Sequence, residues 1–141
     1  MLLYAASKLL SFGAAKLNQN HSTMHHFQKL EVWGMSMTLS YEIHEATKKF
    51  PKNELYGITS QMRRASVSIP SSIAEGSGRK SEKEFLECLY MANGSAYELY
   101  TQIILAFKAN YINEDAKNNL LNKLSSILKK LFKLIQKLSK I

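Results

Sequence analysis

The feature that most constrains this chain is a regular spacing of leucine and isoleucine near its C-terminus. From position 120 onward these residues recur at alternating steps of four and three, at Leu120, Leu124, Ile127, Leu131, Leu134, Leu138 and Ile141. In an α-helix of 3.6 residues per turn, this spacing places the whole row on one face. Three more apolar residues flank the row: Leu121, Leu128 and Ile135. The chain therefore needs further helices to cover an apolar face of this width.

Three further helical segments precede this one, and residues that break helices separate them. The first covers residues 28–50 and ends before Pro51, because proline disfavours helical geometry in the residue before it. The second covers residues 54–75 and ends in Gly76-Ser77-Gly78, and the third covers residues 81–110. Alternation of β-branched residues, which would indicate strands, is absent from the sequence. Because short connections favour antiparallel neighbours, the sequence predicts an all-α protein with an antiparallel up-down-up-down four-helix bundle.

Polar residues at the helix starts support these boundaries. Asn53 and Asn113 can each accept a hydrogen bond from the free amides at the start of the second and fourth helices. Ser81 and Glu84 have the spacing of a capping box, in which the serine hydroxyl binds the Glu84 amide and the Glu84 carboxylate binds the Ser81 amide. These caps predict where the second, third and fourth helices begin.

The first 24 residues differ from the rest of the chain. Their apolar part is interrupted by Lys8 and lacks the basic start of a secretion signal, and residues 18–24 are polar and aperiodic. We expect a poorly ordered or appended leader and linker over residues 1–24 and one domain, the bundle, over residues 25–141. No run of apolar residues is long enough to span a membrane, and a single cysteine excludes a disulfide framework. A cytoplasmic protein is the expectation.

The first and third helices carry more apolar surface than a lone bundle requires. In the first helix one apolar face includes Val32, Leu39 and Ile43, while Trp33 and Tyr41 lie on nearly the opposite face. The third helix has an apolar arc of about 200°, roughly twice what a surface helix needs. Because exposed apolar patches of this extent mark interaction surfaces, we expect a homo-oligomer. The alternative is that the leader folds back over this surface.

Basic charge is concentrated in one segment. The net charge is +8, but residues 1–116 hold twelve Lys and Arg against eleven Asp and Glu, whereas residues 117–141 hold seven Lys and no acid. Such a segment fits nucleic acid, an anionic membrane surface, or only the solvated face of a helix. Lys123, Lys130 and Lys137 recur every seven residues on one border of the leucine row, where their stems can cover its apolar margin. Membrane attachment would require this helix to leave the bundle, so we expect no stable membrane association.

Four other basic residues lie in or just after the second helix. Arg63 and Arg64 are adjacent and point about 100° apart, so they cannot serve one partner alone. They either contact phosphate or pair with carboxylates across a subunit interface. Arg79 and Lys80 lie just ahead of a helix start, where free amides favour anions. With the three lysines that recur every seven residues, these four are the candidate nucleic-acid-binding residues.

Across residues 27–112 the sequence resembles a known family. Its opening is similar to Phe27-x-x-Leu30-x-Val32-Trp33 and Phe50-Pro51-x-x-Glu54-x-Tyr56-Gly57. Its signature is similar to Gln61-Met62-Arg63-Arg64-Ala65 and Ser68-Ile69-Pro70-Ser71-Ser72-Ile73-Ala74-Glu75-Gly76. These motifs resemble the four-helix-bundle proteins encoded in intervening sequences of 23S ribosomal RNA genes, to which accessory proteins of diversity-generating retroelements are related. Ser72 departs from the pattern, which usually has Asn there.

The resemblance implies a bundle that assembles as a homopentameric barrel, in some relatives with a basic surface that binds nucleic acid. It implies no reaction, and the fold carries over better than the function.

No set of residues in the sequence is arranged for catalysis. Residues 76–81 lack the adjacent Gly-Lys and the preceding strand of a phosphate-binding loop. No Glu-x-x-His motif is present for a di-metal site in a bundle, and Cys88 has no acid–base partner. We therefore expect no enzyme activity, catalytic residue, metal or cofactor. The expected function is binding of RNA or DNA through phosphate electrostatics, and the alternative is a scaffold that docks a partner protein such as a reverse transcriptase.

Overall fold

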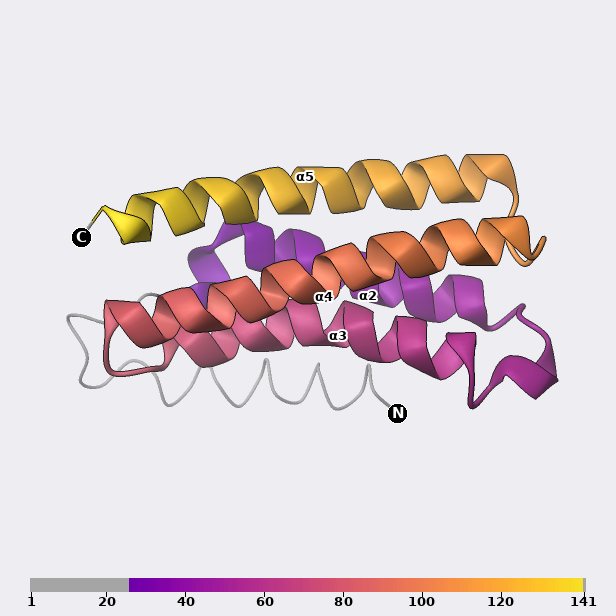
Figure 1. Ribbon diagram of the computed structural model, residues 1–141, viewed down its shortest axis with the longest axis horizontal. Coiled ribbons are helices and arrows are strands. Elements are labelled where there is room, and N and C mark those ends of the chain that lie inside the picture. The colour runs from indigo at the N-terminus through magenta and orange to yellow at the C-terminus, as the bar shows by residue number, and fades with distance from the viewer. Residues whose placement is uncertain (1–25, 141) are drawn as a thin grey trace.

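The computed structural model describes residues 26–140, and its regular structure is entirely helical over that range. Two 3-10 helices, η1 (Phe27–Lys29) and η2 (Lys52–Glu54), accompany four long helices: α2 (Glu31–Thr47), α3 (Ile58–Ser77), α4 (Glu82–Lys108) and α5 (Glu114–Ser139). The four long helices lie side by side as a bundle along the long axis of the molecule (Figure 1). The predicted all-α class is confirmed. The predicted leader and linker, residues 1–24, lie outside the described residues.

Two of the predicted caps hold their helix starts in place. Asn113 Oδ1 accepts a hydrogen bond from the Ala116 amide at 2.8 Å, as expected for the start of α5. Ser81 Oγ accepts one from the Glu84 amide at 3.2 Å, as expected for the start of α4. The Ser81 hydroxyl also donates to the Glu84 carboxylate at 3.2 Å, so the serine makes both of its bonds to one residue. The starts of α4 and α5 are therefore set by local chemistry that the sequence displays.

The predicted cap of α3 is wrong. The helix begins at Ile58 rather than at Glu54, and no side chain makes a hydrogen bond at its N-cap. The chain after Pro51 forms η2, which moves Asn53 away from the helix start. The Ile58 amide donates instead to Glu54 Oε2 at 3.4 Å, while Glu54 Oε1 accepts a hydrogen bond from the Tyr111 hydroxyl at 3.1 Å. The carboxylate of Glu54, which is hydrogen-bonded to Tyr111, therefore accepts the hydrogen bond at the start of α3 in place of the expected asparagine.

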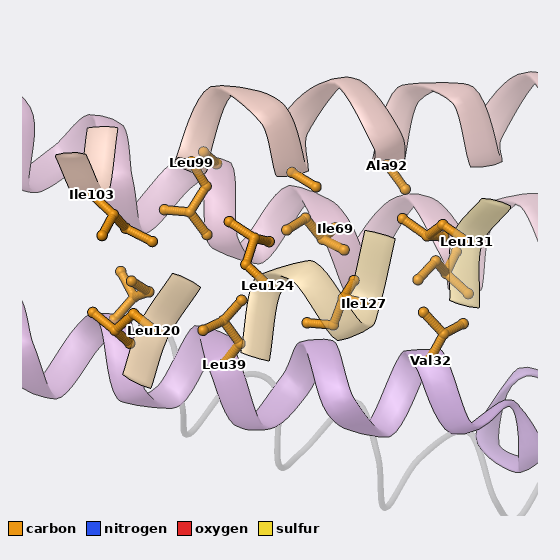
Figure 2. Close-up of a cluster of buried hydrophobic side chains, with 14 of the residues drawn as sticks. Val32, Leu39, Ile69, Ala92, Leu99, Ile103, Leu120, Leu124, Ile127 and Leu131 are labelled. Atoms are coloured by element: carbon orange, nitrogen blue, oxygen red, sulfur yellow. The ribbon is translucent and has the colours of Figure 1, made fainter. Parts of the chain in front are cut away.

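The apolar faces of the four long helices meet in one core (Figure 2). The leucine row of α5 enters this core between Leu120 and Leu131, where it meets Leu39 of α2, Ile69 of α3 and Leu99 of α4. Most of these side chains are fully buried. Removal of this much apolar surface from water is the main term that stabilises the bundle.

The row departs from a strict seven-residue repeat near its end. Ile135 is buried, whereas Leu134 is only half-buried. An α-helix drifts about 20° per heptad against a seven-residue repeat, and this drift turns Ile135 toward the core. Ile141, the last member of the predicted row, lies outside the described residues.

Each long helix packs against two others. α2 and α4 both contact α3 and α5, and the contact between α3 and α4 is the most extensive. There Gly76 comes so close to α4 that an added Cβ would stand 2.6 Å from the Cβ of Cys88. The hydroxyls of Ser68 on α3 and Ser95 on α4 are hydrogen-bonded at 2.8 Å. The short side chains of α3 therefore allow the backbones of the two helices to approach closely.

Candidate nucleic-acid interface

Arg63 is the candidate residue most firmly fixed by the fold. Its Nε donates to Thr47 Oγ1 of α2 at 2.8 Å, and its Nη2 donates to the His44 carbonyl at 3.5 Å. The Thr47 hydroxyl can accept because its own proton goes to the Ile43 carbonyl at 2.8 Å. Arg63 is half-buried, and part of its guanidinium joins α3 to α2. This residue therefore positions the two helices as well as carrying charge.

Arg64 is exposed and makes no hydrogen bond or ion pair with any other of residues 26–140. An open hollow of about 480 Å³ is lined by both arginines together with Leu55, Ser60, Val67 and Ser68. Both arginines border this hollow, although adjacent positions on a helix point about 100° apart. Adjacent positions on a helix can border the same depression when neighbouring side chains are short, as those of Ser60 and Ser68 are here.

Arg79 and Lys80 are exposed in the connection between α3 and α4. Arg79 forms an ion pair with Glu75, four residues earlier, and both side chains are about half exposed. The hydrogen bond to Glu75, followed by the attraction of its charge, raises the pKa of the Arg79 guanidinium. Lys80 has no such partner within the described part of the chain. The two residues therefore differ in how much charge they offer to a ligand.

The three lysines that recur every seven residues on α5 also differ. Lys123 forms an ion pair with Glu42 of α2, and Lys130 forms one with Glu31 of α2 at 2.8 Å. These pairs join α5 to α2 along one border of the leucine row, so they have a structural role beside the predicted one. Lys137 is exposed in the last turn of α5, with no ion pair to any residue from 26 to 140.

The candidate residues therefore do not gather into one site within a single chain. The hollow beside Arg64 lies on α3, whereas Lys123 and Lys130 lie where α5 meets α2. The connection between α3 and α4 does lie at the same end of the bundle as the last turns of α5 (Figure 1). Arg79, Lys80 and Lys137 thus belong to one end of the molecule, and η2 belongs to the other.

Sequence reasoning missed an aromatic residue on the outer side of α5. Phe132 is 60% exposed, although its neighbour Leu131 is completely buried. Lys129, three residues earlier, lies beside it on the helix surface and is exposed, as is Lys133, the next residue in the chain. The signal was present in the sequence, because Phe132 stands about 100° from Leu131 on a helix and therefore outside the leucine row.

A second exposed surface consists of apolar side chains on α4. It contains Tyr97, which is 59% exposed, and three other exposed residues: Tyr90, Met91 and Leu105. Gly94 lies between them, and no atom of the described residues outside its own helix would come within 4 Å of an added Cβ. The predicted excess of apolar surface on the third helical segment is therefore real in the single chain. We call these four side chains the α4 apolar strip.

The groups that could carry other chemistry are few in the described residues. Burial, followed by the charge of Arg63, lowers the pKa of His44. Cys88 is buried against α3, beside Gly76. Among residues 26–140 no three His, Cys, Asp or Glu side chains lie where they could hold a metal ion together. No helix in that range is long and apolar enough to cross a membrane.

The fold and its surfaces define a small all-α bundle protein that displays separate basic and aromatic areas. Comparison with known sequences is more specific. The chain belongs to the 23S rRNA-intervening sequence protein family, whose sequence model matches residues 28–133. The resemblance noted from the motifs is therefore confirmed at the level of the family.

Among solved structures, the chain is similar to a protein of unknown function from the S23 ribosomal protein family of Bacteroides thetaiotaomicron. The TM-score is 0.68 and the sequence identity is 24%, over 74% of this chain and 97% of that chain. An identity this low shows a shared fold and carries no residue roles. No curated protein matches the sequence.

Proposed function

We propose that this chain is a non-enzymatic, cytoplasmic, homo-oligomeric protein that binds RNA or DNA through the charge of the phosphates. The observation that carries the proposal is that basic side chains on α3, on α5 and in the connection between α3 and α4 are exposed and lie outside the ion pairs of the fold. Arg64, Lys80, Lys129, Lys133, Lys137 and Lys140 are exposed and form no ion pair with any of residues 26–140. Lysine and arginine in this state can neutralise phosphates and release the counterions bound to them.

The proposal is tested by the salt dependence of nucleic-acid binding. We expect fluorescence anisotropy to show binding of a labelled RNA or DNA at about 50 mM salt, with affinity falling by several powers of ten toward about 200 mM. A double variant, Lys80→Glu with Lys137→Glu, should weaken binding at least tenfold. The matched control is Lys49→Glu with Lys52→Glu, which makes the same charge change on exposed residues at and before η2. Absence of binding at low salt, or affinity that does not respond to salt, would contradict the proposal.

The proposed assembly is a closed ring of bundles with up-down-up-down order, a homopentamer by the family resemblance. The α4 apolar strip supports it, because a monomer would leave Tyr97 and Leu105 in water. The pattern of helix neighbours supports the topology, because each long helix contacts those before and after it in the chain and α5 returns to α2. Light scattering should give a mass of five 16.0 kDa chains, and a monomer would contradict the proposal.

The same strip favours a second candidate function, that of a scaffold for a partner protein. Tyrosine and methionine are enriched at protein interfaces, and a reverse transcriptase is the partner that the resemblance to retroelement accessory proteins would imply. This function predicts a stoichiometric protein partner that survives nuclease treatment. It also predicts that Tyr97→Ser weakens that complex while phosphate-driven binding is unchanged.

A further inference from the structure

The outer side of α5 carries an arrangement that the fold does not require. We call it the α5 strip and define it as Lys129, Phe132, Lys133, Gln136 and Lys140. All five side chains are exposed, and Phe132 is exposed to 60%. The core is already closed on the opposite side of α5 by the leucine row, so burial does not explain the phenylalanine.

The helix dipole favours Lys140 at the C-cap of α5, but Lys129 and Lys133 lie before the last turn and gain little from it. Lys129 and Lys133 are four residues apart, as are Lys133 and Lys137, and like charges at this spacing destabilise an isolated helix. The chain has no acidic residue after Asp115 that could offset them from within α5. Glu42 of α2 does not offset them either, because it forms an ion pair with Lys123 on the other border of α5.

The geometry of a straight helix places the strip in one line. Positions 129, 133, 136 and 140 follow one another at steps of four and three residues, and Phe132 lies beside Lys129 and Gln136. With a rise of 1.5 Å per residue, the strip is about 16 Å long. That length matches no more than about five stacked nucleotides at 3.4 Å each.

We propose that the α5 strip binds single-stranded nucleic acid, with phosphates on its lysines and a base stacked on Phe132. This inference rests on the proposed function and adds to it the strandedness of the ligand. A duplex hides the faces of its bases inside the helix, so an exposed aromatic ring on a convex surface gains nothing from it. A single strand offers base faces, and lysines beside an aromatic ring are the combination that sequence-tolerant single-strand binders use.

An anionic membrane is a weaker fit to the same strip. Helices that lie on membranes insert a broad apolar face, and on α5 that face is buried in the core from Leu120 to Leu138. Phe132 is the only large apolar side chain of α5 that is exposed among residues 114–140. One aromatic ring gives a base a platform, whereas membrane anchoring needs several buried apolar groups.

The test compares Phe132→Leu with the unmodified full chain. Leucine keeps an apolar side chain and a good helix former at this position but removes the aromatic face. Binding is measured by anisotropy with a labelled 12-nucleotide uridine strand and with a 12-base-pair RNA duplex, at one low salt concentration. We expect Phe132→Leu to weaken single-strand binding at least about fivefold, to leave duplex binding unchanged, and Phe132→Trp to restore the former. Tyr56→Leu, which removes a ring that is 93% exposed between η2 and α3, is the matched control and should change neither.

Each other outcome has a defined meaning. If the chain binds nucleic acid and Phe132→Leu has no effect, the strip is not a stacking site, and the proposed function stands without it. If neither ligand binds at low salt, the proposed function itself fails. A change of oligomeric mass in Phe132→Leu would place the ring in a subunit interface and overturn the inference. Binding of anionic lipid vesicles that depends on Phe132, in the absence of nucleic-acid binding, would overturn it as well.

Discussion

Replacement of Gly76 by alanine tests the close contact between α3 and α4. Its backbone φ is negative, so alanine is compatible with the helix, and in a free helix the change would stabilise by about 1 kcal/mol. In the folded protein the new Cβ would stand 2.6 Å from Cys88 Cβ and 2.7 Å from Phe85 Cδ2. Apolar carbons pack at about 3.5–4.0 Å, so α3 and α4 would have to separate by roughly 1 Å.

The expected result is a net loss of stability. Overpacking of a filled core costs about 1–3 kcal/mol, which exceeds the gain in helix propensity. We expect Gly76→Ala to lower the free energy of unfolding by about 1–2 kcal/mol, measured by urea denaturation with circular dichroism at a fixed protein concentration.

The matched control is Gly34→Ala on α2. Among residues 26–140, an added Cβ there meets no atom within 4 Å outside its own helix, so we expect only the helix propensity to change. This variant should be stabilised by up to about 1 kcal/mol. If Gly76→Ala were stabilised as much as Gly34→Ala, the close approach of α3 to α4 would be refuted.

Three further predictions concern single side chains. Lys123→Met should lower the free energy of unfolding by about 1 kcal/mol, because it leaves the partly buried Glu42 carboxylate unpaired, and Glu42→Gln in the same chain should recover part of the loss in a double-mutant cycle. Asn113→Ala should cost about 1 kcal/mol in the same assay, whereas Asn53→Ala should change stability by less than about 0.5 kcal/mol, and equal effects would contradict the cap assignment. Since burial and the charge of Arg63 lower the pKa of His44 below 6.5, its neutral form is favoured in the folded chain. The associated stability is present above pH 6.5 and is lost as the pH falls below it, so thermal unfolding of His44→Gln should show a weaker decline between pH 7.5 and 5.5.

The parts of the fold that the sequence predicted are those that depend on neighbours in the chain. Asn113 and Ser81 cap the helices that follow them because the amides they bind are three residues away. Asn53 does not cap α3, because the Ile58 amide binds the Glu54 carboxylate instead. That carboxylate also accepts a hydrogen bond from Tyr111, which lies 57 residues further along the chain. A contact between residues so far apart in the chain produces no local pattern in the sequence from which it could be predicted.

In the candidate site, too, the features that depend on nearby residues could be predicted and those that depend on distant contacts could not. Exposure of Lys80 and Lys137 follows from their place at a helix start and a helix end. The hydrogen bond from Arg63 to Thr47 depends on how α3 packs on α2, and no period in the sequence encodes it. Phe132 was not predicted as a site residue, because the spacing of the leucine row identifies only the residues of α5 that enter the core.

The ion pairs between α5 and α2 have a consequence for how this surface can vary. Lys123 and Lys130 form ion pairs with α2, whereas Lys129 and Lys133, on the outer side of α5, form none with residues 26–140. Substitutions at the second pair can therefore change what the outer surface attracts without a penalty in stability. One edge of α5 therefore carries residues that the packing of the bundle requires. The residues of its other edge can differ between relatives that bind different ligands.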